Sequence, residues 1–319
     1  MHSDKSAILR WNSEGVTVAG VNSTNGSAAN LLYYPFDLVV DWSYTLFVAD
    51  RNNNRIQKFS RGSSNARTVA GRADGVAGST DTTFKEPTSL LVDDDGNIHI
   101  SDVNNHRVMF WKKDAVQGTR VAGNGVAGSS DNQLINPVGL AYDYRSNSLF
   151  IADYGNSRVM QYLYNSSTGI RVAGNDTCGT STIQLCRPHG LFFEQSSNSL
   201  LIANSGAYNI VRWVLNDTQW SIVVGSSGGT SGISPSTFGY PTDVMLDPMG
   251  NIYVADRSNH RIQFFMAGQL NATTIAGQTA MVGSSATLLS SPIAMTFDNQ
   301  LNLYVADWYN YRIQKFSRY

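Results

Sequence analysis

Residues 252–265 read IYVADRSNHRIQFF, and the chain repeats this pattern five more times. The other copies are LFVADRNNNRIQKF at 46–59, IHISDVNNHRVMFW at 98–111, LFIADYGNSRVMQY at 149–162, LLIANSGAYNIVRW at 200–213 and LYVADWYNYRIQKF at 303–316. The acidic position of the pattern recurs in steps of 52, 51, 51, 52 and 51 residues, at Asp50, Asp102, Asp153, Asn204, Asp256 and Asp307. A proline precedes each copy at a similar spacing, at Pro35, Pro87, Pro137, Pro188, Pro241 and Pro292. A period of about fifty residues with markers in phase indicates a repeat protein.

Each unit is predicted to contain four short strands, here called a to d. Strand a follows the proline, as in DLVVD at 37–41, and strand b is the apolar run before the Asp. Strand c begins at the Arg, as in RIQKF at 55–59, and strand d is a segment such as TVAG at 68–71. The a–b turns carry tight-turn chemistry, as in DPMGN at 247–251. Since no segment has sustained helical periodicity, we expect an all-β, six-bladed β-propeller of four-stranded blades.

The repeats predict one domain over 1–319, although length alone suggests two. The blades are expected at roughly 35–71, 87–123, 137–174, 188–225, 241–277 and 292–319. Residues 1–20 contain VTVAG at 16–20, a strand d without its own a, b and c, whereas the chain ends on a strand c. The N-terminal segment is therefore expected to supply the outer strand of the last blade and to close the ring. ILRW at 8–11 is surplus, and either packs outside the ring or is the remnant of a preceding unit.

The Asp-x-x-Asn-x-Arg spacing brings a carboxylate and a guanidinium together across a tight b–c turn. We interpret the pairs as structural ion pairs rather than catalytic groups. They are Asp50 with Arg55, Asp102 with Arg107, Asp153 with Arg158, Asp256 with Arg261, and Asp307 with Arg312. In the fourth unit both partners become Asn, at Asn204 and Asn209, so that neither charge is left alone in a semi-buried turn.

The units resemble NHL repeats, whose Asn-His pair stands at Asn105-His106 and Asn259-His260, each followed by Arg. The resemblance covers essentially the whole chain and implies a six-bladed propeller. It also implies that His106 and His260 are turn residues of the repeat rather than metal ligands.

In a propeller the b–c and d–a loops share one face, where rigidly displayed loops carry function. The d–a loops of this chain are long, differ between units and are rich in Gly, Ser and Thr. The candidate ligand-binding residues on this face are Tyr34, Asp37, His189, Tyr208, Tyr240, Asp243, Trp308 and Tyr309. Tyr33, Tyr154 and Phe238 are further aromatic residues expected to be exposed there. A rim of aromatics suits a protein, peptide or glycan ligand, and the alternative is that some of these rings only cover the blades.

The fourth unit differs from the others at three places on this face. Cys178 and Cys186 lie in its d–a loop, His189 follows its proline, and its b–c turn lacks the ion pair. The cysteines are predicted to form a disulfide, with two free thiols as the alternative. The unit is either a specialised surface or a blade that tolerates drift.

Three other functions are alternatives to a binding module: a lyase, a calcium-dependent hydrolase and an RNA-binding domain. Arg187-Pro188-His189-Gly190 resembles the Pro-His metal-ligand step of the peptidyl-hydroxyglycine amidating lyases, which share the fold. Catalytic zinc requires three protein ligands. The residues that follow the prolines of the other five units are Phe36, Thr88, Val138, Thr242 and Ile293, and none of them is a histidine. A calcium-dependent hydrolase using Asp37, Asp243 and His189 has a weak signal. RNA binding, known for some NHL propellers, is disfavoured by a net charge of -1. The sequence thus predicts no enzyme activity, no cofactor and no metal.

The compartment is predicted from the cysteines and from Asn-x-Ser/Thr sequons. The sequons fall in c–d or d–a connections, at Asn22, Asn25, Asn165, Asn175, Asn216 and Asn271. Met1 to Lys5 is polar, and the apolar runs are too short to span a bilayer. We therefore expect a monomeric, extracellular or secreted binding domain without a membrane span, on its own or within a longer protein; the alternative is a cytoplasmic location.

Overall fold

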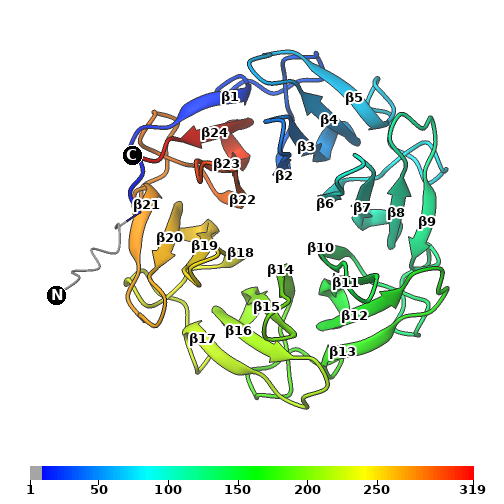
Figure 1. Ribbon diagram of the computed structural model, residues 1–319, viewed down its shortest axis with the longest axis vertical. Coiled ribbons are helices and arrows are strands. Elements are labelled where there is room, and N and C mark those ends of the chain that lie inside the picture. The colour runs from blue at the N-terminus through cyan, green and yellow to red at the C-terminus, as the bar shows by residue number, and fades with distance from the viewer. Residues whose placement is uncertain (1–8) are drawn as a thin grey trace.

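The computed structural model describes residues 9–319, in which 24 strands form six four-stranded sheets. The sheets stand around a central axis like the blades of a propeller (Figure 1). Within 9–319 there is no α-helix, and the helical segments are six 3-10 turns of three residues each. The predicted all-β, six-bladed propeller is therefore confirmed.

The strands follow the predicted order a to d in every blade. Blade 1 contains β2 (Pro35–Val40), β3 (Leu46–Asp50), η1 (Arg51–Asn53), β4 (Arg55–Phe59) and β5 (Ala66–Gly71). Blade 2 contains β6 (Pro87–Val92), β7 (Ile98–Asp102), η2 (Val103–Asn105), β8 (Arg107–Trp111) and β9 (Thr119–Ala122). Blade 3 contains β10 (Pro137–Asp143), β11 (Ser148–Asp153), η3 (Tyr154–Asn156), β12 (Arg158–Leu163) and β13 (Ile170–Gly174).

The second half of the ring repeats this order. Blade 4 contains β14 (Pro188–Glu194), β15 (Ser199–Asn204), η4 (Ser205–Ala207), β16 (Asn209–Val214) and β17 (Ser221–Gly225). Blade 5 contains β18 (Pro241–Leu246), β19 (Ile252–Asp256), η5 (Arg257–Asn259), β20 (Arg261–Phe265) and β21 (Thr273–Gly277). Blade 6 contains β22 (Pro292–Phe297), β23 (Leu303–Asp307), η6 (Trp308–Asn310) and β24 (Arg312–Phe316), with β1 (Val16–Gly20) as its outer strand.

The N-terminal strand closes the ring as predicted. β1 pairs antiparallel with β24, so strands from the two ends of the described chain lie in one sheet (Figure 1). The described part of the surplus segment packs against the seam between blades 5 and 6. There the Trp11 indole Nε1 donates to the Leu301 carbonyl at 2.8 Å, and its ring lies 5.8 Å from Tyr253 and Phe264. Ile8 lies outside the described residues.

The hydrophobic core is divided into clusters that lie between neighbouring blades. One cluster joins Ile262 of blade 5 to Val305 of blade 6, and the next joins Ala306 of blade 6 to Val48 of blade 1. These side chains are fully buried. Because each sheet buries its two faces against its neighbours, the ring forms a rigid support for its loops.

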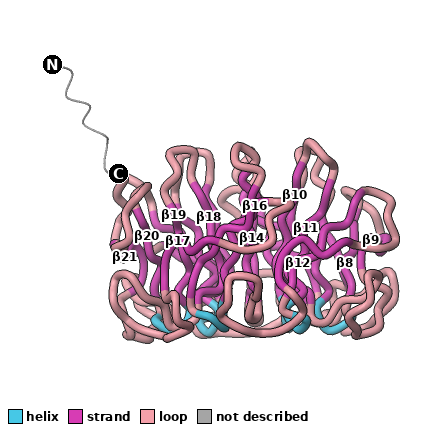
Figure 2. The backbone as a smooth tube through the Cα atoms, turned by 90° about the horizontal axis from the view of Figure 1, so that it is seen from below, coloured by secondary structure: helices cyan, strands magenta, loops and turns pink. Residues whose placement is uncertain are grey.

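The six 3-10 turns all lie on one face of the ring, here called the η face (Figure 2). The buried Asp at the end of strand b organises this face. In blade 2 the Asp102 carboxylate accepts hydrogen bonds from Arg107 Nε at 2.8 Å, Asn105 Nδ2 at 2.8 Å and the Lys85 backbone N–H at 2.7 Å. Arg107 also donates to the carbonyls of the d–a loop that enters the same blade, at Ser79, Thr80 and Thr83. We call this Asp, Asn and Arg set the clamp, and the d–a loop the entry loop.

The clamp is present in five blades, with Arg Nε to Asp Oδ2 distances of 2.7–3.0 Å. Its members are Asp50, Asn53 and Arg55; Asp102, Asn105 and Arg107; Asp153, Asn156 and Arg158; Asp256, Asn259 and Arg261; and Asp307, Asn310 and Arg312. The pair expected to lock the b–c turn therefore also fastens the entry loop, with the help of the Asn of the repeat pattern, whose role was not predicted from the sequence.

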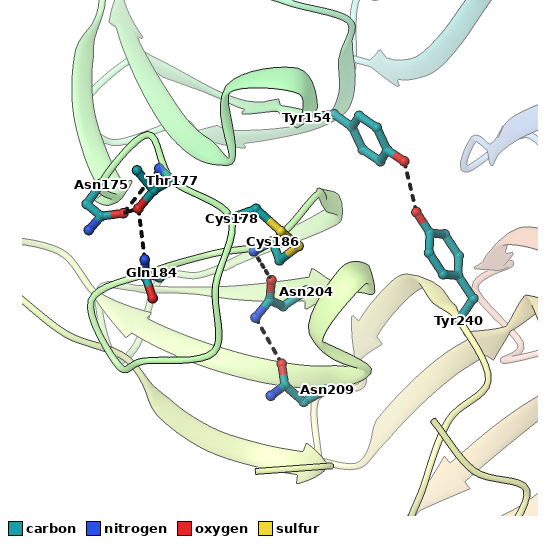
Figure 3. The surroundings of a disulfide bond; sticks show 9 residues. All are labelled: Tyr154, Asn175, Thr177, Cys178, Gln184, Cys186, Asn204, Asn209 and Tyr240. Carbon is teal, nitrogen blue, oxygen red and sulfur yellow. Dashed lines mark hydrogen bonds between the residues drawn. A yellow bond between two sulfur atoms is a disulfide. The ribbon is translucent and has the colours of Figure 1, made fainter. Parts of the chain in front are cut away.

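Blade 4 replaces the clamp by neutral bonds and a disulfide (Figure 3). Asn204 Nδ2 donates to Asn209 Oδ1 at 3.0 Å, while Asn204 Oδ1 accepts from the Cys186 backbone N–H at 2.7 Å. Ala207 stands where the other blades have the clamp Asn. Cys178 and Cys186 form a disulfide within the entry loop. A covalent bond thus holds the loop of the one blade that lacks the charged clamp.

Candidate functional site

The mouth of the central channel on the η face is the candidate site. The innermost strand of each blade lines the channel, and its second residue lies next to the mouth. In blades 1 and 4, which face each other across the ring (Figure 1), these residues are Phe36 and His189. Their rings stack with centroids 5.4 Å apart and planes inclined by 16°, so they narrow the channel. His189 was predicted from the sequence as a candidate site residue, whereas its partner Phe36 was not.

His189 is held in its neutral form. Burial and the neighbouring Arg257 lower the pKa of His189 to about 3. The imidazole is therefore uncharged at neutral pH. Within residues 9–319 no three His, Cys, Asp or Glu side chains are placed to hold a metal ion. The donor set around His189 thus does not fit the three-ligand zinc site of a lyase.

Asp37 and Asp243 lie deeper, lining a channel cavity of about 160 Å³. Asp37 Oδ2 accepts from Ser89 Oγ at 2.9 Å and from the Leu90 backbone N–H at 3.0 Å, and Asp243 Oδ2 accepts from the Met295 N–H at 3.0 Å. Each carboxylate therefore joins its own blade to the next one. Burial raises the pKa of Asp37 to about 6, and burial together with Asp37 raises the pKa of Asp243 well above its usual range.

A cluster of five aromatic side chains occupies the side of the mouth between blades 6 and 1. We call it the aromatic cluster; it consists of Tyr33, Tyr34, Trp308, Tyr309 and Tyr311. The Tyr34 ring lies 5.0–5.6 Å from each of the other four. Tyr309 is 46% exposed, and the others are half-buried. Hydrogen bonding to the Tyr311 hydroxyl and burial raise the pKa of Tyr34 to about 12, so the phenol is neutral. Tyr33, Tyr34, Trp308 and Tyr309 were predicted from the sequence to lie on this face, whereas Tyr311 was not.

Two further tyrosines meet on the other side of the mouth. The hydroxyls of Tyr154 and Tyr240, from blades 3 and 5, are 2.9 Å apart and bridge past blade 4 (Figure 3). Burial and this hydrogen bond raise the pKa of Tyr240. Tyr208 is half-buried at the end of η4 and makes no ring contact with either of them in the described residues. The expected exposure of Phe238 is wrong: the side chain is fully buried, because it packs against Phe265 in the hydrophobic cluster between blades 4 and 5.

The mouth also holds hydrogen-bond donors without acceptors. The guanidinium of Arg257 lies 4.3 Å from the Trp308 ring centroid and that of Arg51 lies 5.7 Å from the Phe36 centroid. Arg51 forms an ion pair with Glu86, yet its Nε is buried and has no acceptor among residues 9–319. The same holds for the indole Nε1 of Trp308. Buried donors are rarely left unpaired in folded proteins, so this side of the mouth is suited to a ligand that carries acceptor atoms.

Comparisons with known proteins agree with the repeat pattern. The NHL repeat model matches residues 32–59 and 238–265. NHL repeat-containing protein 2 from Bos taurus is 25% identical in an alignment 347 residues long, which includes 89% of this chain and 46% of that protein. Peptidyl-glycine alpha-amidating monooxygenase from Mus musculus is 29% identical over 42% of this chain and 14% of that protein. This chain spans less than half of the length of the curated relatives it matches.

A solved structure of similar fold is an auxiliary nutrient binding protein from Bacteroides ovatus. It superposes with a TM-score of 0.70 at 11% identity, over 98% of this chain and 77% of that chain. At this identity the likeness concerns the fold alone. The six four-stranded sheets thus define the protein as a six-bladed β-propeller. Two of its six units, in blades 1 and 5, match the NHL repeat model, in agreement with the resemblance seen in the sequence. No helix within residues 9–319 has the length and apolarity needed to cross a membrane.

Proposed function

We propose that the chain is a non-enzymatic binding module that recognises a peptide, a segment of a protein or a glycan at the η-face mouth. The observation that carries this proposal is the aromatic cluster. Its half-exposed rings come from the entry loop of blade 1 and from η6, which are both fixed by clamps. Rigid aromatic side chains lose little conformational entropy on binding and contribute large contact areas.

An array experiment tests the proposal. The domain would be applied to glycan and peptide arrays, and the selected ligand measured against a Tyr34→Ala, Trp308→Ala double variant. We expect the double variant to lose at least about tenfold in affinity, since aromatic anchors commonly contribute 2 kcal/mol or more. Trp42→Ala is the matched control, because Trp42 is 77% exposed in an a–b turn on the opposite face. Binding that survives the double variant, or that is confined to single-stranded RNA, contradicts the proposal.

We also propose an extracellular or secreted setting. The disulfide supports it, since such bonds persist in oxidising compartments. Five of the six sequon asparagines are exposed, and the sixth, Asn175, is half-buried and accepts a hydrogen bond from Thr177 Oγ1 at 2.6 Å. The exposed sites are Asn22, Asn25, Asn165, Asn216 and Asn271. Mass analysis of protein from its native source, with and without reduction and deglycosylation, tests this setting; free thiols and unmodified sequons contradict it.

A further inference from the structure

We propose that the mouth holds a ligand with a single carboxylate, bound by Arg257, Arg51 Nε and Trp308 Nε1. This inference rests on the proposed binding function, because it names the chemistry of the ligand at the same mouth. The three groups come from the first positions of η5, η1 and η6. These are equivalent positions in three consecutive blades, each directly after the buried Asp of a clamp. The clamps therefore fix the backbone that carries the donors.

The first argument is the set of free donors. The guanidinium of Arg257 forms no hydrogen bond and no ion pair with any residue in 9–319, and it lies 4.3 Å from the centroid of the Trp308 ring. A guanidinium that lies over an aromatic ring keeps the N–H groups at its edge free, and their planar arrangement matches the two oxygens of a carboxylate. Trp308 Nε1 and Arg51 Nε add two buried donors without acceptors. An acceptor placed among them would satisfy groups that are otherwise costly to bury.

The second argument is the local charge. Burial and, to a smaller extent, the nearby charge of Arg257 lower the pKa of Arg51. Glu86 neutralises one of the two charges through its ion pair with Arg51. His189 is neutral, and Tyr34 remains protonated at neutral pH. Arg51, Arg257 and Glu86 at the mouth together leave one excess positive charge, whereas Asp37 lies in the cavity behind the Phe36–His189 stack. This excess charge complements a monoanion such as a carboxylate better than a phosphate dianion, which would also face Glu86.

The third argument is the shape of the channel. The stacked rings of Phe36 and His189 narrow the passage, and Asp37 and Asp243 line the cavity behind them. An anion that moved deeper would approach these two acids, whose oxygens are already engaged by the next blade. The carboxylate therefore stays at the mouth. The rest of the ligand then extends over the aromatic cluster, which suits a ring-shaped body.

The test compares carboxylates with their neutral counterparts by calorimetry and by NMR of the tryptophan indole N–H signals. One arm uses D-glucuronate against D-glucose, and the other uses N-acetyl-L-phenylalanine against its amide, so the arms separate a sugar acid from an amino-acid carboxylate. We expect at least one carboxylate to bind, with its neutral counterpart at least about tenfold weaker. The indole N–H signal of Trp308, which is identified by its absence in the Trp308→Phe variant, should shift when the carboxylate binds.

The variants place the carboxylate. Arg257→Gln should weaken carboxylate binding by about 10- to 100-fold, the range expected for losing hydrogen bonds to a charged group. Arg61→Gln is the matched control, because Arg61 also lies over an aromatic ring, 4.6 Å from the Tyr44 centroid, but at turns on the opposite face. It should leave the affinity unchanged.

Three results would overturn the inference. The first is equal affinity for a carboxylate and its neutral counterpart, and the second is carboxylate binding that Arg257→Gln does not weaken. The third is that no carboxylate shifts the indole signal at about 10 mM, a concentration at which millimolar affinity is detected. The proposed binding function fails differently. It stands if a neutral ligand from the arrays loses affinity in the Tyr34→Ala, Trp308→Ala variant, and fails if no ligand depends on these two rings.

Discussion

Removing the carboxylate of one clamp should destabilise the whole propeller measurably. Asp102 is fully buried, and it accepts three hydrogen bonds, one of them from the buried Arg107. Asp102→Ala leaves the guanidinium without its counter-charge, and breaking a buried pair in this way costs about 3–5 kcal/mol. For 319 residues the unfolding entropy is about 0.7 kcal/mol/K. The melting temperature should therefore fall by about 4–7 °C, measured by differential scanning calorimetry.

Blade 4 supplies the control for this prediction. Its Asn204–Asn209 pair shows that the ring accepts a neutral pair at this position. Asp102→Asn combined with Arg107→Asn reproduces that pair in blade 2. Because the double variant leaves no unpaired charge, its loss of stability should be smaller than the sum of the two single losses. An unchanged melting temperature for Asp102→Ala would refute the structural role of the clamp, and additive losses would refute its ionic basis.

Three further predictions concern the disulfide, the blade contacts and His189. Reducing the Cys178–Cys186 bond, which closes a loop of eight residues, should lower the free energy of unfolding by about 2–3 kcal/mol. It should also raise hydrogen exchange at 175–187 above that of the other entry loops. Equal exchange before and after reduction would contradict this prediction. Gly139→Ala should lower the free energy of unfolding by about 1–3 kcal/mol in urea, because the new Cβ would lie 2.0 Å from the His189 carbonyl oxygen. The control Gly228→Ala, which has open space around it, should change the free energy of unfolding little. Equal effects of the two variants would count against the close contact between blades 3 and 4. Since the pKa of His189 is lowered to about 3, the unfolded chain binds a proton between about pH 6.5 and 3 that the folded chain does not bind, and this group therefore reduces stability as the pH falls. The variant His189→Asn should lose about 2 kcal/mol less unfolding free energy between pH 7 and pH 5 than the parent protein. An unchanged dependence of stability on pH would argue for a solvated imidazole.

The fold could be predicted because its determinants recur in phase. Each unit carries its own proline, buried Asp and turn residues, and the lone strand at 16–20 matches the missing strand after Arg312–Phe316. The clamp was only partly recognised. Its Asn was visible in the same alignment, since the position is Asn in five units and Ala207 in the fourth. The coincident loss of Asp, Asn and Arg there was a readable sign that these three residues act together.

The site was less predictable because it forms between blades rather than within them. The Phe36–His189 stack joins residues about half a ring apart, and no local pattern marks such a pair. Asp37 was selected as a ligand-binding candidate, but its hydrogen bonds to blade 2 depend on how closely neighbouring inner strands approach. Phe238 has the composition of an exposed loop around it and is nevertheless buried. Tertiary packing decided each of these positions.

The proposal that the η-face mouth is the binding site is tested most directly by a hydrogen–deuterium exchange footprint. The domain would be labelled with and without the ligand selected on the arrays, at a saturating concentration. We expect slower exchange at 33–36 and 308–311, which form the aromatic cluster and its edge, and no change in the a–b turns on the opposite face. Protection confined to the a–b turns or to the outer strands, with 33–36 and 308–311 unchanged, would contradict it.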